Sequence, residues 1–134
     1  MLKTVLKFAV IVFAMLLSAC GSLNMEKPDA TKTWSASKLY AEAKDELNGG
    51  NYEKSIKYFE KLESRYPFGA YAQQAQMEIA YAYYRQNDQA QCLAAVERFI
   101  RLHPNHANVD YMYYLRGLAN FNDKKGLFDF ISRQ

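Results

Sequence analysis

The chain has 134 residues, of which 17 are basic and 14 acidic, and half of its residues are hydrophobic. Lys3 and Lys7 lie in a segment that we expect to be removed, which leaves a mature chain of about 115 residues with a net charge near +1. That length is enough for one domain. The nearly balanced charge and the lack of a basic stripe argue against a nucleic acid as the partner.

The first 19 residues have the pattern of a signal peptide. Lys3 and Lys7 precede an uninterrupted apolar run of ten residues, 8–17, which is too short for a membrane-spanning helix of about 20 residues. The run ends in LSAC at 17–20, which resembles the lipobox of bacterial lipoproteins. The resemblance implies cleavage before Cys20, a diacylglycerol on its thiol and an acyl chain on its amine. The alternatives are an ordinary signal peptide with a chance cysteine and an uncleaved anchor.

The residues after the cysteine bear on where the protein is held. Three acyl chains would hold it on a membrane, because each buried methylene contributes about 0.8 kcal/mol. Gly21 and Ser22 stand where enterobacterial lipoproteins of the inner membrane carry an aspartate, so the resemblance favours the periplasmic face of the outer membrane. Residues 20–33 are polar and lack periodicity, which predicts a lipidated N-terminus and a flexible tether.

Residues 34–134 are expected to form a domain of α-helices. Apolar residues recur at helical spacing and predict helices over 36–48, 52–66, 71–86, 89–102 and 108–121, a turn over 122–126 and the start of a sixth helix at 127. Ser35 is placed to cap the first helix, and Gly49 or Gly50 to end it in the left-handed conformation. The helix over 71–86 is apolar on most of its surface, so we expect it to be central.

The helical region repeats with a period of 37 residues. This spacing separates Pro67 from Pro104, and it also separates the small residues Ala43, Ala80 and Gly117. A fixed period of this length, with one pair of helices in each copy, indicates a helical solenoid. Solenoids usually end in a capping helix with a polar outer face. Here the last residues include the apolar side chains Leu127, Phe128, Phe130 and Ile131. We therefore expect the natural chain to continue beyond residue 134.

The residues that could carry chemistry do not form an enzyme site. Cys92 occupies a small-residue position of the repeat, which predicts a buried, unreactive thiol, and with Cys20 lipidated no internal disulfide is available. His103 and His106 are separated by Pro104, so they do not share a helical face, and we assign them to a solvated turn. No glycine-rich phosphate loop is present, and no nucleophile has a credible base. We expect no enzymatic activity, no metal and no cofactor beyond the covalent lipid.

Within each copy the pattern resembles the tetratricopeptide repeat, a pair of helices of about 34 residues. The sequence GNYEKSIKYFEKL at 50–62 looks like its second half, with Ser55 at the usual alanine. The next copy has Asn87 in place of the turn glycine and Cys92 in place of the alanine. The resemblance implies an all-α tetratricopeptide-repeat helical solenoid of about two and a half repeats. They cover residues 34–69, 70–106 and, incompletely, 107–134.

Three stretches take the resemblance beyond generic repeats. They read ESRYPFG at 63–69, AYAYYR at 80–85, and RFIRLHP at 98–104 followed by DYMYYLRGL at 110–118. With the lipobox, they resemble the BamD (ComL-type) family of lipoproteins, which belong to the β-barrel assembly machine of the Gram-negative outer membrane. The resemblance implies a scaffold that binds BamA, other assembly-machine lipoproteins and unfolded outer-membrane β-barrel proteins. The alternative is another tetratricopeptide lipoprotein, such as a type IV pilus pilotin, which would bind a secretin.

Tetratricopeptide solenoids bind peptides in a groove lined by the first helix of each pair. By that analogy, the following residues are expected to face a partner-binding groove: Tyr40, Lys44, Leu47, Gln74, Met77, Tyr81, Tyr84, Arg85, Tyr111, Tyr114, Leu118 and Phe121. Their aromatic and apolar side chains would receive the aromatic C-terminal residue of a barrel strand, while Lys44 or Arg85 would pair with its carboxylate. The alternative for each aromatic residue is packing between helices.

Overall fold

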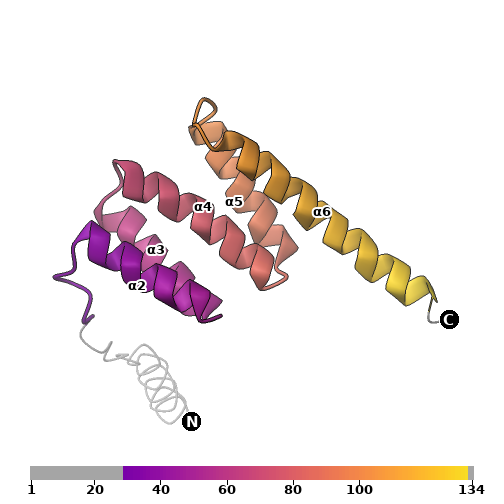
Figure 1. Cartoon of the computed structure of the whole chain (residues 1–134), viewed down its shortest axis with the longest axis horizontal. Helices are drawn as coiled ribbons and strands as arrows, with labels where there is room; N and C mark the ends of the chain where they lie inside the picture. Colours follow the sequence, from indigo (N-terminus) through magenta and orange to yellow (C-terminus); the bar gives the residue numbers. More distant parts are fainter. Residues whose placement is uncertain (1–28, 133–134) are drawn as a thin grey trace, which may run out of the picture. The chain divides into compact units, whose positions relative to one another are not determined.

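The computed structural model describes residues 29–132, with side chains over residues 29–121. The chain divides into one unit of residues 1–32 and a second of residues 33–134. The helices of the second unit are α2 (Ala36–Asn48), α3 (Tyr52–Arg65), α4 (Ala70–Arg85), α5 (Gln89–Leu102) and α6 (Val109–Ser132) (Figure 1). No strand occurs between residues 29 and 132, and the predicted all-α helical solenoid is confirmed.

Several predictions fall on residues that the structure does not describe. The signal peptide, Cys20 and most of the tether precede residue 29, and the apolar side chains at 127–131 follow residue 121. Over the part of the chain that is described, no helix combines the length and the apolar character needed to cross a membrane.

Ser35 begins α2 as predicted, because its hydroxyl accepts a hydrogen bond from the Lys38 N–H at 3.3 Å.

The turn between the two helices of each repeat has the same backbone conformation in both copies. Gly50 and Asn87 stand one 37-residue period apart, and both are left-handed, with φ values of +80° and +60°. Glycine adopts this conformation freely, and asparagine is enriched among the other residues that do. This explains why asparagine can replace the turn glycine in the second copy.

Prolines end α3 and α5. Tyr66, before Pro67, and His103, before Pro104, both leave the helical region, with φ near −130° and ψ near +60°. The ring of a proline disfavours the helical conformation in the residue before it. The helix α3 therefore ends at Arg65, one residue earlier than predicted. The helix α4 begins and ends one residue before its predicted bounds.

The predicted turn over residues 122–126 is wrong. The helix α6 runs unbroken from Val109 to Ser132, so the expected fifth helix and the start of the sixth are one element. The segment contains no proline to break the helix, and Gly126 alone costs only about 1 kcal/mol relative to alanine. The polar residues Asn122 and Asp123, which suggested a turn, are also compatible with a helix.

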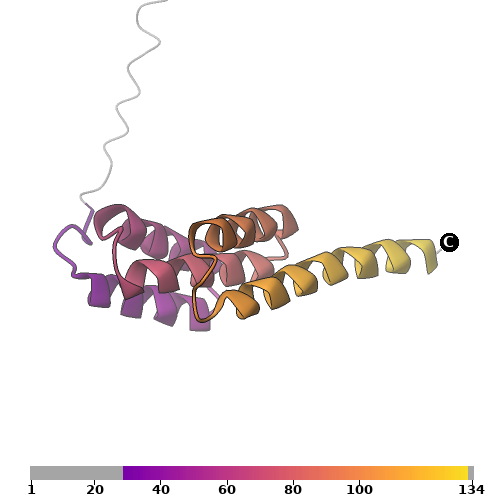
Figure 2. The same cartoon turned by 90° about the horizontal axis from the view of Figure 1, so that it is seen from above.

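The helices form two layers. The helices α2, α4 and α6, each the first of a pair, form what we call the inner layer, and α3 and α5 form the outer layer (Figure 2). Neighbouring helices of the inner layer contact each other directly, α2 with α4 and α4 with α6. No Cα atom of α3 lies within 8 Å of one of α5. The stack is therefore tighter on the inner side and splayed on the outer side.

Two hydrophobic clusters share α4, which confirms its predicted central position. The first cluster lies between α2, α3 and α4 and contains the fully buried Phe59; the second lies between α4, α5 and α6 and contains the fully buried Phe99. The helix α4 contributes Ala75 to the first cluster and Ala80 to the second. Small residues on both faces allow the neighbouring helices to approach α4 closely.

The structure also explains the two departures at the alanine position of the tetratricopeptide pattern. Ser55 is fully buried, and its hydroxyl donates a hydrogen bond to the Ala43 carbonyl oxygen at 2.8 Å, so the polar atom is satisfied inside the core. Cys92 is also fully buried, and burial raises the pKa of its thiol from 9.0 to about 11. The predicted burial of Cys92 is confirmed, and a buried, protonated thiol is expected to be unreactive near neutral pH.

A polar cluster joins the outer layer to α4. It consists of Glu63 on α3, Gln76 on α4, Arg98 on α5 and His103 after α5, and we call it the outer cluster. The Glu63 carboxylate accepts hydrogen bonds from Gln76 Nε2, at 2.9 Å, and from the Arg98 guanidinium. The amide oxygen of Gln76, Oε1, lies 3.0 Å from Nε2 of His103. The side chains around the cluster leave a cavity of only about 10 Å³.

The two histidines are part of the packing. The ring centroids of His103 and His106 lie 5.0 Å and 5.2 Å from that of Phe99, and both rings are half-buried. The two histidines do lie in the turn between α5 and α6, as predicted, but their rings are partly buried rather than fully solvated. Pro104 keeps them off a common helical face, but it also folds the chain back so that both rings meet the same phenylalanine.

Candidate functional site

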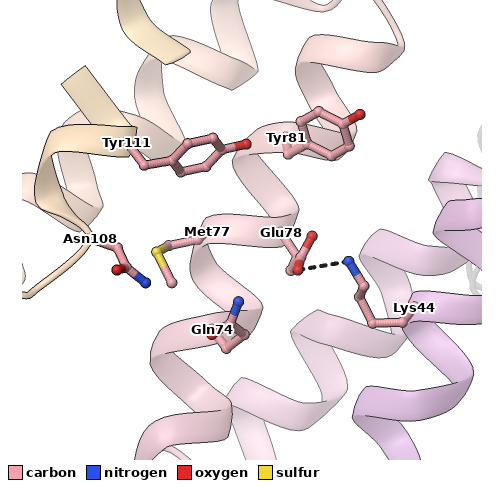
Figure 3. Close-up of a pocket in the computed structure, with 7 residues that line it drawn as sticks. All are labelled: Lys44, Gln74, Met77, Glu78, Tyr81, Asn108 and Tyr111. Atoms are coloured by element: carbon pink, nitrogen blue, oxygen red, sulfur yellow. Dashed lines mark hydrogen bonds and ion pairs between the residues drawn. The ribbon is translucent and has the colours of Figure 1, made fainter. Parts of the chain in front are cut away.

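The inner layer contains a pocket of about 330 Å³ between α2, α4 and the start of α6. We call it the inner pocket. It is lined by Lys44, Gln74, Met77, Glu78, Tyr81, Asn108 and Tyr111 (Figure 3). A wider hollow of about 620 Å³ opens beside the α2–α3 turn, but charged, exposed side chains such as Glu53, Lys54 and Lys57 line it, and its lining is more polar than apolar.

The spacing of residues along α4 builds the floor of the inner pocket. Glu78 follows Gln74 by four residues, and Tyr81 follows Met77 by four, which places all of these side chains on one helical face. Lys44 reaches this face from α2, on one side, and Tyr111 reaches it from the first turn of α6, on the other (Figure 3). The pocket is therefore a product of the repeat stacking, because three successive first helices each contribute a side chain.

The charges in the inner pocket are paired. The Glu78 carboxylate accepts hydrogen bonds from Lys44 Nζ at 2.9 Å and from the Tyr40 hydroxyl at 3.3 Å, and its side chain is only 13% exposed. Burial and the nearby Glu78 charge raise the pKa of Tyr40 to about 12, and the same two causes raise that of Tyr111 to about 12. Both phenols are therefore neutral donors at physiological pH.

Arg85 lies beside the pocket rather than in it. Its Nη1 donates a hydrogen bond to the Tyr81 hydroxyl at 2.8 Å, and its guanidinium carbon lies 5.3 Å from the ring centroid of Tyr52 and 5.7 Å from that of Tyr81. Within residues 29–121 no carboxylate pairs with Arg85, and the side chain is exposed. The guanidinium is thus positioned by aromatic rings and keeps donors available.

The structure brings together, in one pocket, five of the twelve residues that the sequence places in the groove. These five residues line the inner pocket: Lys44, Gln74, Met77, Tyr81 and Tyr111. Tyr40 lies behind Glu78, where its ring packs against Phe59 and Tyr71 with centroids 5.6 Å and 5.5 Å away. Tyr114 is 61% exposed on α6 and does not line the pocket.

Other aromatic and apolar residues expected in the groove lie elsewhere. Leu47 is only 4% exposed and belongs to the first hydrophobic cluster, so its placement in the groove is wrong. It lies one turn beyond Ala43 on the buried stripe of α2, and that stripe faces α3 and α4. Tyr84 packs partly buried against the second cluster. Leu118 and Phe121 are on α6 beyond the pocket.

Sequence reasoning missed Glu78 and Asn108. Glu78 could have been found, because it follows Gln74 by four residues and precedes Tyr81 by three on a helix that was correctly predicted. Glu78 is also the only acidic residue of α4, which is a signal in itself, since a partly buried carboxylate needs partners. Asn108 carried no such signal, because it lies in the turn before α6 and its position depends on the path of that turn.

The pocket can bind an uncharged side chain and hold a peptide backbone beside it. Tyr81, Tyr111 and Met77 offer aromatic and thioether surface, and the amides of Gln74 and Asn108 can each donate to and accept from a backbone. Because Glu78 and Lys44 neutralise each other, the cation left to recognise a carboxylate is Arg85, at the rim next to Tyr81.

Comparison with known proteins gives one family. A family model described as an outer membrane lipoprotein, YfiO, matches residues 32–134. A curated protein of Neisseria gonorrhoeae, an outer membrane protein assembly factor BamD, is 48% identical over 120 residues, which cover 88% of this chain and 45% of the relative. Proteins of the same name from Vibrio cholerae and Xylella fastidiosa are 44% and 35% identical over 105 and 112 residues, covering 78% and 84% of this chain. The chain spans less than half the length of these relatives, namely 45%, 42% and 38%.

Proposed function

The chain belongs to the YfiO family of outer membrane lipoproteins, and on this premise we propose that it is a non-enzymatic scaffold for the assembly of β-barrel proteins in the outer membrane. The name of its relatives, outer membrane protein assembly factor, supports this proposal. We further propose that Cys20 carries the lipid, as its lipobox implies, and that the helical unit works at the periplasmic face of the outer membrane. Its proposed partners are BamA, other lipoproteins of the assembly machine and unfolded barrel proteins.

The inner pocket is the proposed site for unfolded barrel proteins. The observation that carries this assignment is the combination of an open pocket walled by Tyr81 and Tyr111 with an adjacent guanidinium, Arg85, that no described carboxylate neutralises. A chain that ends in an aromatic residue presents an aromatic ring and a carboxylate a few ångströms apart. The ring would enter the pocket, and the carboxylate would bind Arg85.

A peptide binding experiment tests this assignment. A labelled peptide ending in phenylalanine is made as the free acid and as the C-terminal amide, and its affinity is measured by fluorescence anisotropy. The unmodified chain should bind the acid about tenfold more tightly, which corresponds to about 1.4 kcal/mol for one exposed charge-assisted hydrogen bond. Arg85→Gln should bind the two peptides equally.

The controls separate the charge from the fold. Arg101→Gln removes an exposed arginine from α5 of the outer layer and should keep the tenfold preference. Tyr81→Ala should weaken the binding of both peptides, because it removes a wall of the pocket. If Arg85→Gln folds normally and still prefers the acid, Arg85 does not recognise the carboxylate.

The proposed partner is tested separately by capture. The tagged, lipidated chain is solubilised from outer membranes, and the proteins that remain bound are identified by mass spectrometry. Recovery of BamA supports the role in barrel assembly. Recovery of a secretin without BamA would contradict it and would favour a pilotin.

A further inference from the structure

Glu78 is the feature of the inner pocket that the proposed function leaves unexplained. A site for a peptide carboxylate gains nothing from a carboxylate of its own, yet Glu78 lies in the lining and is only 13% exposed. Two donors from the preceding repeat hold it, Lys44 Nζ at 2.9 Å and the Tyr40 hydroxyl at 3.3 Å. The carboxylate is therefore part of a built arrangement that spans two repeats.

The lining contains one cation and one anion. Of the seven lining residues, only Lys44 and Glu78 carry formal charges, and they form an ion pair, so the net charge of the lining is zero. A ligand carboxylate that entered the pocket would lose hydration and would meet the negative charge of Glu78 at close range. An uncharged aromatic or aliphatic side chain pays neither cost. The pair thus selects against a carboxylate inside the pocket.

Among the residues with described side chains, Arg85 is a cation without a carboxylate partner, and it lies seven residues further along the same helix. Arg85 is two helical turns from Glu78 and contacts Tyr81, which is itself a wall of the pocket. A peptide whose last side chain fills the pocket can place its terminal carboxylate at Arg85 without approaching Glu78. The reverse orientation, with the carboxylate at Lys44, would bring two carboxylates together.

We propose that Glu78 is a specificity-determining residue, which neutralises Lys44 so that the pocket takes the uncharged side chain of a C-terminal residue and directs its carboxylate to Arg85. This inference rests on the proposed function, because it concerns the same peptide and the same pocket. It predicts that removing the charge of Glu78 creates a second carboxylate site, at Lys44.

The test uses the acid and amide peptides ending in phenylalanine, titrated by fluorescence anisotropy into variants of the whole chain. Arg85→Gln should lack a preference for the acid. Adding Glu78→Gln to Arg85→Gln should restore a preference of about tenfold, because Lys44 is released to bind the carboxylate. Adding Lys44→Met to that double variant should abolish the preference again.

A conservative variant is the matched control. Glu78→Asp keeps the negative charge, so Glu78→Asp combined with Arg85→Gln should show no preference for the acid. Helical circular dichroism and a thermal melt of each variant verify that it is folded. If the folded Glu78→Gln/Arg85→Gln variant binds the amide but shows no preference for the acid, Glu78 does not set the specificity and the inference is overturned.

The failure of the proposed function gives a different result. In that case the unmodified chain binds neither peptide, and the inference falls with the function on which it rests. If instead the unmodified chain prefers the acid but the Glu78→Gln/Arg85→Gln variant shows no preference, the proposed function stands and the role of Glu78 alone is rejected.

Discussion

The inner pocket and the outer cluster each hold a partly buried carboxylate, but they differ in the space around it. Each has a carboxylate with a side chain about 13–14% exposed, Glu78 in the pocket and Glu63 in the outer cluster, and each carboxylate accepts hydrogen bonds from two side chains. Each also joins the first repeat to the second. The difference is the space beside the carboxylate, about 330 Å³ in the pocket and about 10 Å³ in the outer cluster.

The difference teaches how one repeat architecture separates stability from recognition. On the outer side, where the Cα atoms of α3 and α5 stay more than 8 Å apart, the side chains of Glu63 and Arg98 cross the gap and close it. On the inner side the helices contact each other directly, and no side chain has to bridge a gap between them. The side chains of Lys44 and Glu78 instead lie at the edge of an open pocket. We infer that the Glu63–Arg98 ion pair, which closes the gap between α3 and α5, mainly holds the repeats together. The Lys44–Glu78 ion pair, which lines a pocket, can instead contact a ligand.

The largest expected effect comes from opening the closed side. Phe99 is fully buried and forms part of the wall of the outer cluster, so Phe99→Ala should lower the free energy of unfolding by about 3–5 kcal/mol. Urea unfolding followed by circular dichroism measures the change. Tyr114→Ala, at a site that is 61% exposed, should change the free energy by less than about 0.5 kcal/mol. Equal losses in the two variants would contradict the account of the core.

A smaller effect should separate the two carboxylates. Glu63→Ala leaves the part-buried amide of Gln76 without its acceptor, beside a cavity of only about 10 Å³, and should cost about 1–3 kcal/mol of stability. Glu78→Ala should cost less than about 1 kcal/mol, because water can enter the pocket and replace the carboxylate at Lys44. Chemical unfolding of both variants measures the two costs. Glu60→Ala, an exposed position one turn before Glu63, serves as the control.

If Glu78→Ala were the more destabilising of the two variants, the comparison would fail. The ion pair in the pocket would then serve mainly to hold α2 on α4. Peptide binding by the Glu63→Ala variant should be unchanged at temperatures where it remains folded, because none of its lost contacts reaches the inner pocket.

The smallest effect is a pH dependence on the pocket side. The pKa of Tyr40 is raised to about 12 by burial and by the charge of Glu78, so the folded chain holds this proton more tightly than the unfolded chain, where the pKa is about 10. The stability that Tyr40 contributes should be complete below pH 10 and should be lost as the pH rises from 10 to 12. Thermal melts at pH 9 and pH 11 measure this loss, and Tyr40→Phe should lose less stability over the same interval.

Tyr114→Phe is the control for that titration, since its side chain is exposed and lies outside the pocket. It should behave as the unmodified chain does at both pH values. An equal pH dependence in Tyr40→Phe and in the unmodified chain would show that the contact between Tyr40 and Glu78 does not control the titration.

The helices could be predicted from the sequence because their signals are local. The serine cap at Ser35, the left-handed turn at Gly50 and the prolines at 67 and 104 each act within a few residues, and α2 and α5 have the predicted bounds. The error at residues 122–126 has the same origin. Polar residues favour turns locally, but Asn122 and Asp123 are also compatible with a helix, and α6 continues through them.

The candidate site was only partly predictable, because it depends on how the repeats stack. The face of α4 that carries Gln74, Met77 and Tyr81 follows from the helical period, whereas the pairing of Lys44 with Glu78 requires α2 and α4 to lie side by side. Sequence reasoning therefore offered Lys44 and Arg85 as equal candidates for the carboxylate. The structure distinguishes them, because only Lys44 is already paired.

The outer cluster was not predicted, for a similar reason. The stretches at 63–69 and 98–104 were noticed as a family pattern, and the two histidines were assigned to a solvated turn. The structure shows that Glu63, Arg98 and His103 meet across three elements, and that His106 packs against Phe99. A pattern that looked like a signature of function at these positions is in part a signature of packing between repeats.

The most direct test of the account asks which of the two regions contacts an unfolded barrel protein. A photo-crosslinking amino acid is placed at Gln74, in the inner pocket, and separately at Arg101, an exposed position on α5 of the outer layer, in the lipidated chain in growing cells. The account predicts adducts with unfolded outer-membrane barrel proteins at position 74 and none at position 101. Adducts at position 101 with none at position 74 would contradict it, because the ligand would then bind the side of the stack that the outer cluster closes.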